Sequence, residues 1–190
     1  MFASESRADS FCAVASHAAF LRAINVGRRQ ATKARLVSAF EACGFEDVST
    51  FRASGNVLFT APRKGKPKQA EMEKELEAEL GFEVPVFVRS ASQLANVAAL
   101  DPFTPKQIKA SKGKLQVAFL PKKPSKAKAA EVLALELPSD PLSLEGTELL
   151  WLPAAGTQES DLDLKALERA LGPWTMRTMG TVEQIAEKLC

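Results

Sequence analysis

Residues 18–24, with the sequence AAFLRAI, form the first strongly apolar run of the chain and predict a buried β-strand. Asn25-Val26-Gly27 follows directly, and these residues are typical of a turn. A helix then opens at Thr32 or Lys33 and continues to about Cys43, because apolar residues recur at helical spacing along this segment. The chain therefore begins its first predicted unit with a strand, a turn and a helix.

Two further strands, a second helix and a fourth strand complete the first half. Residues 48–53 and 56–60 are strand-like, and Ser54-Gly55 between them is short enough for a tight hairpin. Residues 69–80 have apolar side chains four positions apart, which predicts an amphipathic helix, and residues 84–89 predict the last strand. This order is the split βαβ unit of ferredoxin-like folds, with both helices on one face of an antiparallel sheet.

The second half partly repeats this order. Residues 115–120 predict a strand, residues 125–137 a helix, and residues 142–144 with 148–152 a hairpin. A helix over residues 160–171, a strand over 174–178 and a final helix over 181–189 follow. The fold class is therefore α+β, a ferredoxin-like half followed by a second, related α+β half. We divide the chain into a loose N-terminal leader (1–16), the ferredoxin-like half (17–104), a polar linker (105–113) and the second half (114–190).

Composition excludes several classes of protein. Hydrophobic residues make up 46% of the chain and charged residues 25%, which argues against disorder, and the net charge of +2 does not by itself call for a nucleic-acid or membrane partner. Cys12, Cys43 and Cys190 have no metal-ligand spacing, and three cysteines, an odd number, are a poor disulfide framework. No apolar run approaches the ~20 residues that cross a bilayer. We therefore expect a soluble, cytoplasmic protein without a cofactor or a metal.

Residues 20–27, FLRAINVG, resemble the opening of domain-of-unknown-function family 1697, which typically reads Leu-Leu-Arg-Gly-Ile-Asn-Val-Gly-Gly. Residues 43–48 and 54–59 are similar to the family's Leu-Gly-Phe and Ser-Gly-Asn-Val-Val-Phe blocks, and Arg177 with the residues after it is similar to the closing block. Ala23 stands where the family pattern has its first glycine. The resemblance implies a two-part α+β fold over nearly the whole chain, and it implies no established activity.

Arg22 is the most informative single residue. Alternation along a strand places Phe20 and Arg22 on the same face, and a buried arginine needs partners because an unpaired buried charge is costly. Two interpretations stay open. Either Arg22 recognises a carboxylate or phosphate of a ligand with its planar guanidinium, or it pairs with carboxylates or carbonyls of the protein between the two halves.

Two polar turns accompany Arg22. Residues 25–29 precede the first helix, where backbone N–H groups and arginines attract anions, and an ordinary turn with solvated arginines is the alternative. Residues 54–56 form a compact turn that either contributes side chains to a pocket or reflects turn geometry alone. The candidate ligand-binding residues are Arg22, Asn25, Gly27, Ser54, Asn56 and Arg177.

Three functions are compatible with these observations. The favoured one is binding of a small anionic ligand at the junction of the two halves. The second, less favoured, is a nucleic-acid-binding module that uses the lysine-rich loops 63–68, 106–114 and 122–128, and the third is a dimeric scaffold without a ligand. His17 is the sole histidine and has no Ser, Cys or Asp pattern nearby, so the sequence identifies no catalytic residue and leaves open whether the protein is an enzyme.

Overall fold

The computed structural model describes residues 15–52, 55–62 and 67–189 of the chain. The elements of the first half are, in order, β1 (Ala15–Leu21), α1 (Lys33–Ala42), β2 (Glu46–Thr50), β3 (Asn56–Ala61), α2 (Gln69–Leu80) and β4 (Val86–Ser90). The connecting helices are α3 (Ala91–Ala98) and α4 (Pro105–Ala110). The elements of the second half are β5 (Gln116–Phe119), α5 (Lys126–Leu133), β6 (Leu142–Glu145), β7 (Glu148–Trp151), α6 (Leu164–Leu171), β8 (Thr175–Thr178) and α7 (Met179–Leu189).

Both halves have the same sheet topology. The first sheet has the strand order β2-β3-β1-β4 and the second has the order β6-β7-β5-β8, with antiparallel neighbours throughout. Each half is therefore a split βαβ unit, and the predicted α+β class with two related halves is confirmed. The second half repeats the order of the first completely, whereas the sequence predicted only a partial repeat.

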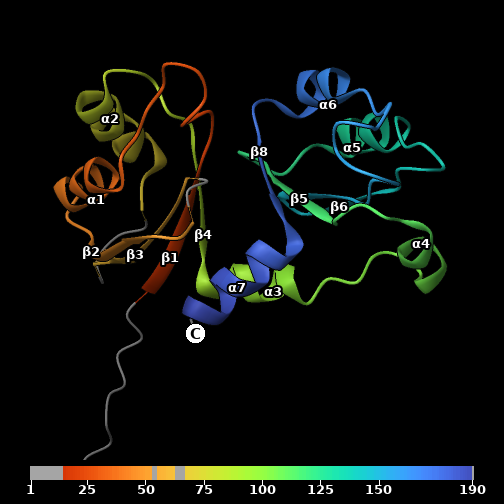
Figure 1. Ribbon diagram of the computed structural model, residues 1–190, viewed down its shortest axis with the longest axis horizontal. Helices are drawn as coiled ribbons and strands as arrows, with labels where there is room; N and C mark the ends of the chain where they lie inside the picture. The colour runs from red at the N-terminus through yellow and green to blue at the C-terminus, as the bar shows by residue number, and fades with distance from the viewer. Residues whose placement is uncertain (1–14, 53–54, 63–66, 190) are drawn as a thin grey trace, which may run out of the picture.

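The elements form layers across the molecule (Figure 1). α1 and α2 cover the outer face of the first sheet, α5 and α6 cover the outer face of the second sheet, and α3 and α7 lie side by side between the halves. Strand alternation produces this arrangement on β1, where Ala19 and Leu21 pack with α1 and α2 whereas Ala18 and Phe20 belong to the opposite face.

The inner faces of the two sheets share one hydrophobic core. It joins Phe20 of β1, Phe119 of β5, Leu94 of α3 and Ile185 of α7, all of which are fully buried. The rings of Phe20 and Phe119 stack with their centroids 4.0 Å apart. Because burial of such a side chain contributes about 1.5–3 kcal/mol, the halves are held together by a common core and not only by the connecting segment.

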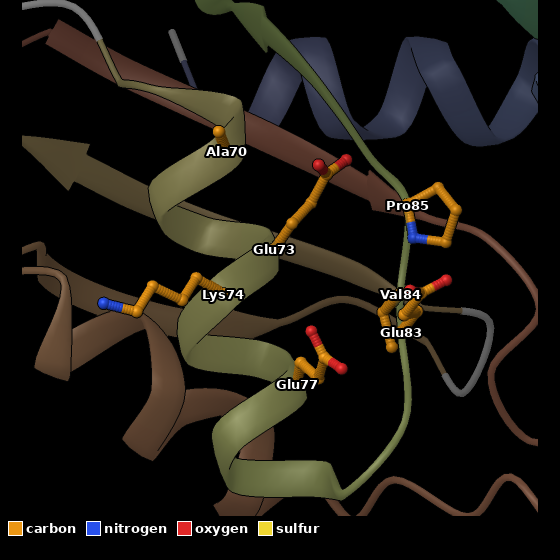
Figure 2. A pocket seen from close by; sticks show the side chains of 7 residues that line it. All are labelled: Ala70, Glu73, Lys74, Glu77, Glu83, Val84 and Pro85. Carbon is orange, nitrogen blue, oxygen red and sulfur yellow. The ribbon is translucent and has the colours of Figure 1, made fainter.

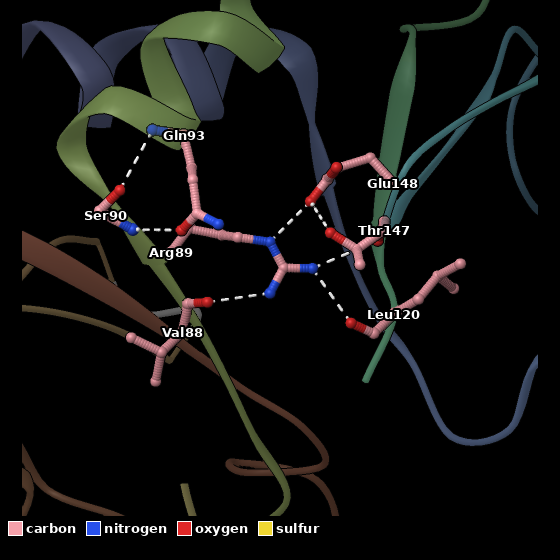
Figure 3. A network of polar contacts seen from close by, with 7 residues as sticks. All are labelled: Val88, Arg89, Ser90, Gln93, Leu120, Thr147 and Glu148. Atoms are coloured by element: carbon pink, nitrogen blue, oxygen red, sulfur yellow. Dashed lines mark hydrogen bonds and ion pairs between the residues drawn. The ribbon is translucent and has the colours of Figure 1, made fainter. Parts of the chain in front are cut away.

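An arginine of the first half reaches across this core (Figure 3). Arg89 of β4 donates from Nε to Glu148 Oε1 at 2.6 Å, and this ion pair is buried, with side-chain exposures of 8% and 11%. Its Nη2 donates to the carbonyls of Leu120 at 3.0 Å and Thr147 at 3.2 Å. The guanidinium also lies 5.3 Å from the centroid of the Phe119 ring. Every one of these partners belongs to the second half.

A second arginine makes the same set of contacts in the opposite direction. Arg177 of β8 donates from Nε to Asn56 Oδ1 at 2.6 Å. Its Nη2 donates to the carbonyls of Leu21 at 3.0 Å and Gly55 at 3.2 Å, and its guanidinium lies 5.7 Å from the centroid of the Phe20 ring. These partners all belong to the first half.

The two arginines are counterparts. The strand registers place Arg89 on β4 and Arg177 on β8 at corresponding positions of the two sheets. In each half, therefore, one arginine of the last strand contacts the other half. It contacts the end of the first strand and the start of the third strand there. The side-chain acceptors differ, because Glu148 begins β7 whereas Asn56 begins β3.

The first strand ends earlier than the sequence predicted. β1 ends at Leu21, so Arg22 follows the strand and does not lie in its middle. Ala23 and Asn25 have φ angles of 55° and 57°, and an extended strand does not continue through such left-handed residues. Ile24 is nevertheless buried, which is why the apolar pattern extended the predicted strand to this residue.

Several predictions beyond the first half also differ from the structure. The helix predicted to end at Leu137 ends at Leu133, as α5, and the final helix, α7, begins at Met179 and not at Thr181. α6 begins at Leu164 and not at Ser160, because Asp163 is the N-cap and its Oδ1 accepts from the Ala166 N–H at 2.8 Å. The segment expected as a polar linker, residues 105–113, contains the short helix α4.

Replacing Arg89 with alanine is expected to lower the free energy of unfolding by about 3–5 kcal/mol, because the buried Glu148 carboxylate loses its cation. Urea denaturation followed by circular dichroism measures this loss, and adding Glu148→Gln is expected to recover part of it. The control is Arg169→Ala, which removes an arginine whose side chain is 71% exposed and should cost less than about 1 kcal/mol. If Arg89→Ala lowered the free energy of unfolding by no more than the control does, Arg89 would not stabilise the contact between the two halves.

Replacing Ala23 with glycine is expected to raise the free energy of unfolding by about 1 kcal/mol, because a Cβ is unfavourable in the left-handed region and glycine removes it. Ala23 is exposed, so the substitution removes no core contact. Ala95→Gly, at an exposed position within α3, is the matched control and should instead destabilise the protein by roughly 0.5–1 kcal/mol. Equal destabilisation in both variants would show that residue 23 carries no strain.

Candidate functional site

A small hollow lies beside the first turn of α1, near the end of β2 and the start of β3. Its volume is about 220 Å³, and its lining includes Asn25, Thr32, Lys33, Arg52, Gly55 and Asn56. We call it the Lys33–Arg52 hollow. Two segments that are separated in the sequence by all of α1 and β2 meet there, and each of them carries a residue that the sequence analysis selected.

Asn25 holds the loop between β1 and α1 in shape. Its N–H donates to the Arg29 carbonyl at 2.6 Å, and its Oδ1 accepts from the Ala31 N–H at 3.0 Å. The N–H of Gln30 donates to the Arg28 carbonyl at 3.1 Å. These N–H groups are therefore engaged within the loop, and any backbone attraction for an anion has to come from the start of α1.

The start of α1 brings positive charge to the hollow. Thr32 is the N-cap, and its Oγ1 accepts from the Arg35 N–H at 3.4 Å. Aligned peptide dipoles and first-turn N–H groups without intrahelical partners make a helix start electropositive. Lys33 adds an ammonium group at this point, and the first turn carries no acidic residue to neutralise it.

Arg52 forms another part of the lining. It lies two residues after the end of β2 with a φ of 58°, and its guanidinium lies 5.6 Å from the centroid of the Phe51 ring. Its Nη2 donates to Gln184 Oε1 of α7 at 2.6 Å, which links the hollow to the second half. Arg52 also borders a larger hollow of about 470 Å³, whose lining includes Lys114, Thr178 and residues of the first turns of α7.

Gly55 and Asn56 connect the hollow to Arg177. Gly55 has a φ of 73°, and a Cβ at this position would lie 2.8 Å from Ile24 Cδ1, so the position requires glycine. Asn56 is fully buried, and its Nδ2 donates to the Phe51 carbonyl at 3.0 Å while its Oδ1 accepts from Arg177. Asn56 thus separates the hollow from the guanidinium behind it.

Arg177 is a cation held by the protein itself. Burial lowers the pKa of Arg177 to about 10, so its guanidinium still carries a positive charge at neutral pH. Besides its contacts with the first half, it donates from Nη1 to the Met176 carbonyl at 2.7 Å and to Thr175 Oγ1 at 2.9 Å. It therefore anchors the turn that carries Gly55 and Asn56.

The remaining candidates lie elsewhere. Arg22 donates from Nη2 to Glu168 Oε1 of α6 at 2.7 Å, so its carboxylate partner comes from the second half of the same chain. Gly27 has a φ of 58° in the loop turn and does not line the hollow. Ser54 lies outside the described residues. Of the predicted residues, the structure thus brings together Asn25, Asn56 and Arg177.

Thr32, Lys33 and Arg52 line the site but were not among the predicted site residues. A signal existed for Thr32 and Lys33, because the sequence predicted that a helix begins there and a helix start attracts anions. Arg52 had no comparable signal, since its position depends on a left-handed turn and on a contact with Gln184, which is distant in the sequence.

The cleft between α2 and β4 has the opposite electrostatic character (Figure 2). Glu73 and Glu77 point from α2 toward the segment that carries Glu83 and Pro85, whereas Lys74 points away from it. Glu73 Oε1 also accepts from the N–H of Val86 at the edge of the sheet, at 3.0 Å. This cleft would repel an anion.

Membrane-spanning helices and clusters of metal-ligating side chains are both absent from the described part of the chain. No helix there has both the length and the apolar character that crossing a bilayer requires. Across the same residues, no three His, Cys, Asp or Glu side chains are grouped so that they could hold a metal ion.

Comparisons with known proteins agree with this architecture. The structure of the conserved bacterial protein SP0830 from Streptococcus pneumoniae matches with a TM-score of 0.68, covering 92% of this chain and 98% of that chain at 21% sequence identity, which supports the fold alone. A search of curated proteins finds no match. The family model described as "Protein of unknown function (DUF1697)" matches residues 14–150. The chain therefore belongs to the DUF1697 family.

Proposed function

We propose that the protein binds a small anionic ligand through a phosphate or carboxylate group in the Lys33–Arg52 hollow, which is lined by the first half and is linked to the second half through the contact of Arg52 with Gln184. One observation carries this proposal. Two cationic side chains and the start of α1 line a single hollow, and the described residues of its lining include no Asp or Glu.

The chemistry of the lining suits an oxyanion. A guanidinium forms charge-assisted hydrogen bonds with carboxylates and phosphates, which are roughly twice as strong as neutral ones. A helix start adds N–H groups and a favourable dipole for the same charge. Lys33 and Arg52 approach from different segments, so an anion between them would be held from two directions. The volume of about 220 Å³ suits the charged end of a small molecule.

Arg22 has a different part in this proposal from the one that the sequence suggested. Its guanidinium already has the Glu168 carboxylate as a partner. We therefore assign Arg22 to the contact between the halves and base ligand binding on Lys33 and Arg52, with Asn25 and Asn56 shaping the hollow.

Two observations weigh against the nucleic-acid alternative. Phe20 and Phe59 are buried, so they offer no ring for a base to stack on. The described parts of the lysine-rich segments also lie apart: Lys68 is the N-cap of α2 in the first half, and the other two segments lie at α4 and α5 on different sides of the second half (Figure 1). A dimeric scaffold that paired through a sheet face would need a free face, and the inner faces of both sheets are covered by the shared core; pairing through a sheet edge stays open.

Titration of the ¹⁵N-labelled protein with inorganic phosphate, and separately with succinate at constant ionic strength, tests the proposal. We expect saturable shifts of the amide signals of Lys33, Gly55 and Asn56. Lys33→Gln and Arg52→Gln should each weaken binding about tenfold, because each removes one charge-assisted contact.

Lys123→Gln is the matched control, because it removes one exposed positive charge far from the hollow along the chain. It should leave the affinity unchanged. Shifts that do not saturate, or equal weakening by Lys123→Gln and Lys33→Gln, would mean that only nonspecific charge attraction is present. Single-stranded RNA in the same assay, with a steep dependence on salt and signals at the lysine-rich segments, would favour the alternative function.

A further inference from the structure

A second hollow, of about 480 Å³, lies between α4 and the segments that flank β6 and β7. Its apolar lining consists of Ala110, Pro138, Pro141, Leu152 and Ala154. The polar residues Lys106, Gln107, Ser111 and Ser139 complete it. We call it the α4 hollow. It shares no lining residue with the Lys33–Arg52 hollow, and its volume lies within the usual range of small-molecule sites.

Most polar side chains of the α4 hollow are already engaged by the protein. Gln107 Oε1 accepts from the N–H of Thr104 at 2.8 Å, in the capping box that starts α4. Ser111 Oγ donates to the Pro153 carbonyl at 2.6 Å, and Ser139 Oγ donates to Asp140 Oδ2 at 2.7 Å.

The backbone adds few further groups for a ligand. Pro138 and Pro141 have no N–H, and the Ala154 carbonyl accepts from the N–H of Lys112 at 2.7 Å. A ligand rich in hydroxyl groups would therefore lose hydrogen bonds to water without gaining enough partners in this hollow. The ligand body that suits it is apolar.

Lys106 is the one charged residue among the described residues of this lining, and it forms no ion pair with any described residue. Its ammonium group is exposed on the first turn of α4. An apolar hollow with a single cation at its edge matches a molecule that carries one negative charge at the end of a hydrocarbon body.

We infer that the α4 hollow binds a small monocarboxylic acid with an apolar body, its carboxylate on Lys106 and its hydrocarbon part against Pro138, Pro141 and Leu152. None of the residues of α4 is buried, although the helix forms one wall of the hollow. A bound hydrocarbon chain would cover the inner side of α4 and remove apolar surface from water, which is the driving force for binding.

Hexanoate, 1-hexanol and acetate separate the two parts of this inference. In titrations of the ¹⁵N-labelled protein, hexanoate should shift the amide signals of Ala110 and Leu152 saturably. 1-Hexanol, which lacks the charge, should bind about tenfold more weakly. Acetate, which lacks the four CH₂ groups of the body, should bind roughly a hundredfold more weakly.

Lys106→Met should weaken hexanoate binding about tenfold and leave 1-hexanol binding unchanged, because only the charged contact is removed. Lys109→Met, on the same short helix but outside the lining, is the matched control and should change neither. Ala110→Leu should weaken binding of both probes, because the larger side chain occupies part of the hollow. Equal binding of hexanoate and 1-hexanol, equal effects of the two lysine variants, or shifts that do not saturate would overturn the inference.

Discussion

The exchange of two arginines across the shared core is the interaction on which the rest of this structure depends. Arg89 and Arg177 each lie on the last strand of one half. Each donates hydrogen bonds to backbone carbonyls of the other half, at the end of its first strand and beside the start of its third strand. The stacked rings of Phe20 and Phe119 lie in the core between the sheets. The inner face of each sheet is apolar and would otherwise be exposed, so each half provides the cover that the other half requires.

The same exchange holds the candidate anion site in place. Arg177 binds the Gly55 carbonyl and the Asn56 side chain, so the second half holds the turn that leads from Arg52 into β3. Arg52 in turn contacts Gln184 of α7. The corresponding position in the second half is Glu148, and a carboxylate at position 56 would place negative charge in the lining of the hollow. Asparagine there satisfies the arginine and keeps the hollow electropositive.

Much of the fold was predictable from local pattern, and the errors have identifiable causes. The α2 helix was predicted with its observed ends, because apolar residues four apart and a terminal glycine both act within the segment. The end of β1 was misplaced because Ile24 is buried although the backbone has already left the strand. Burial results from contacts with distant residues, and an apolar pattern does not distinguish a strand from a buried turn.

The sequence by itself determined the order of most of the elements and their two-part arrangement, and it marked Asn25, Asn56 and Arg177 as candidate site residues, because periodicity, turn chemistry and motif resemblance are properties of short segments. Only the tertiary structure decided which arginine pairs with a carboxylate and which lines a hollow. Arg22 meets Glu168, and Arg52 meets Gln184, across separations of more than one hundred residues. Such pairings arise when two sheets pack face to face, and nothing within either segment specifies them.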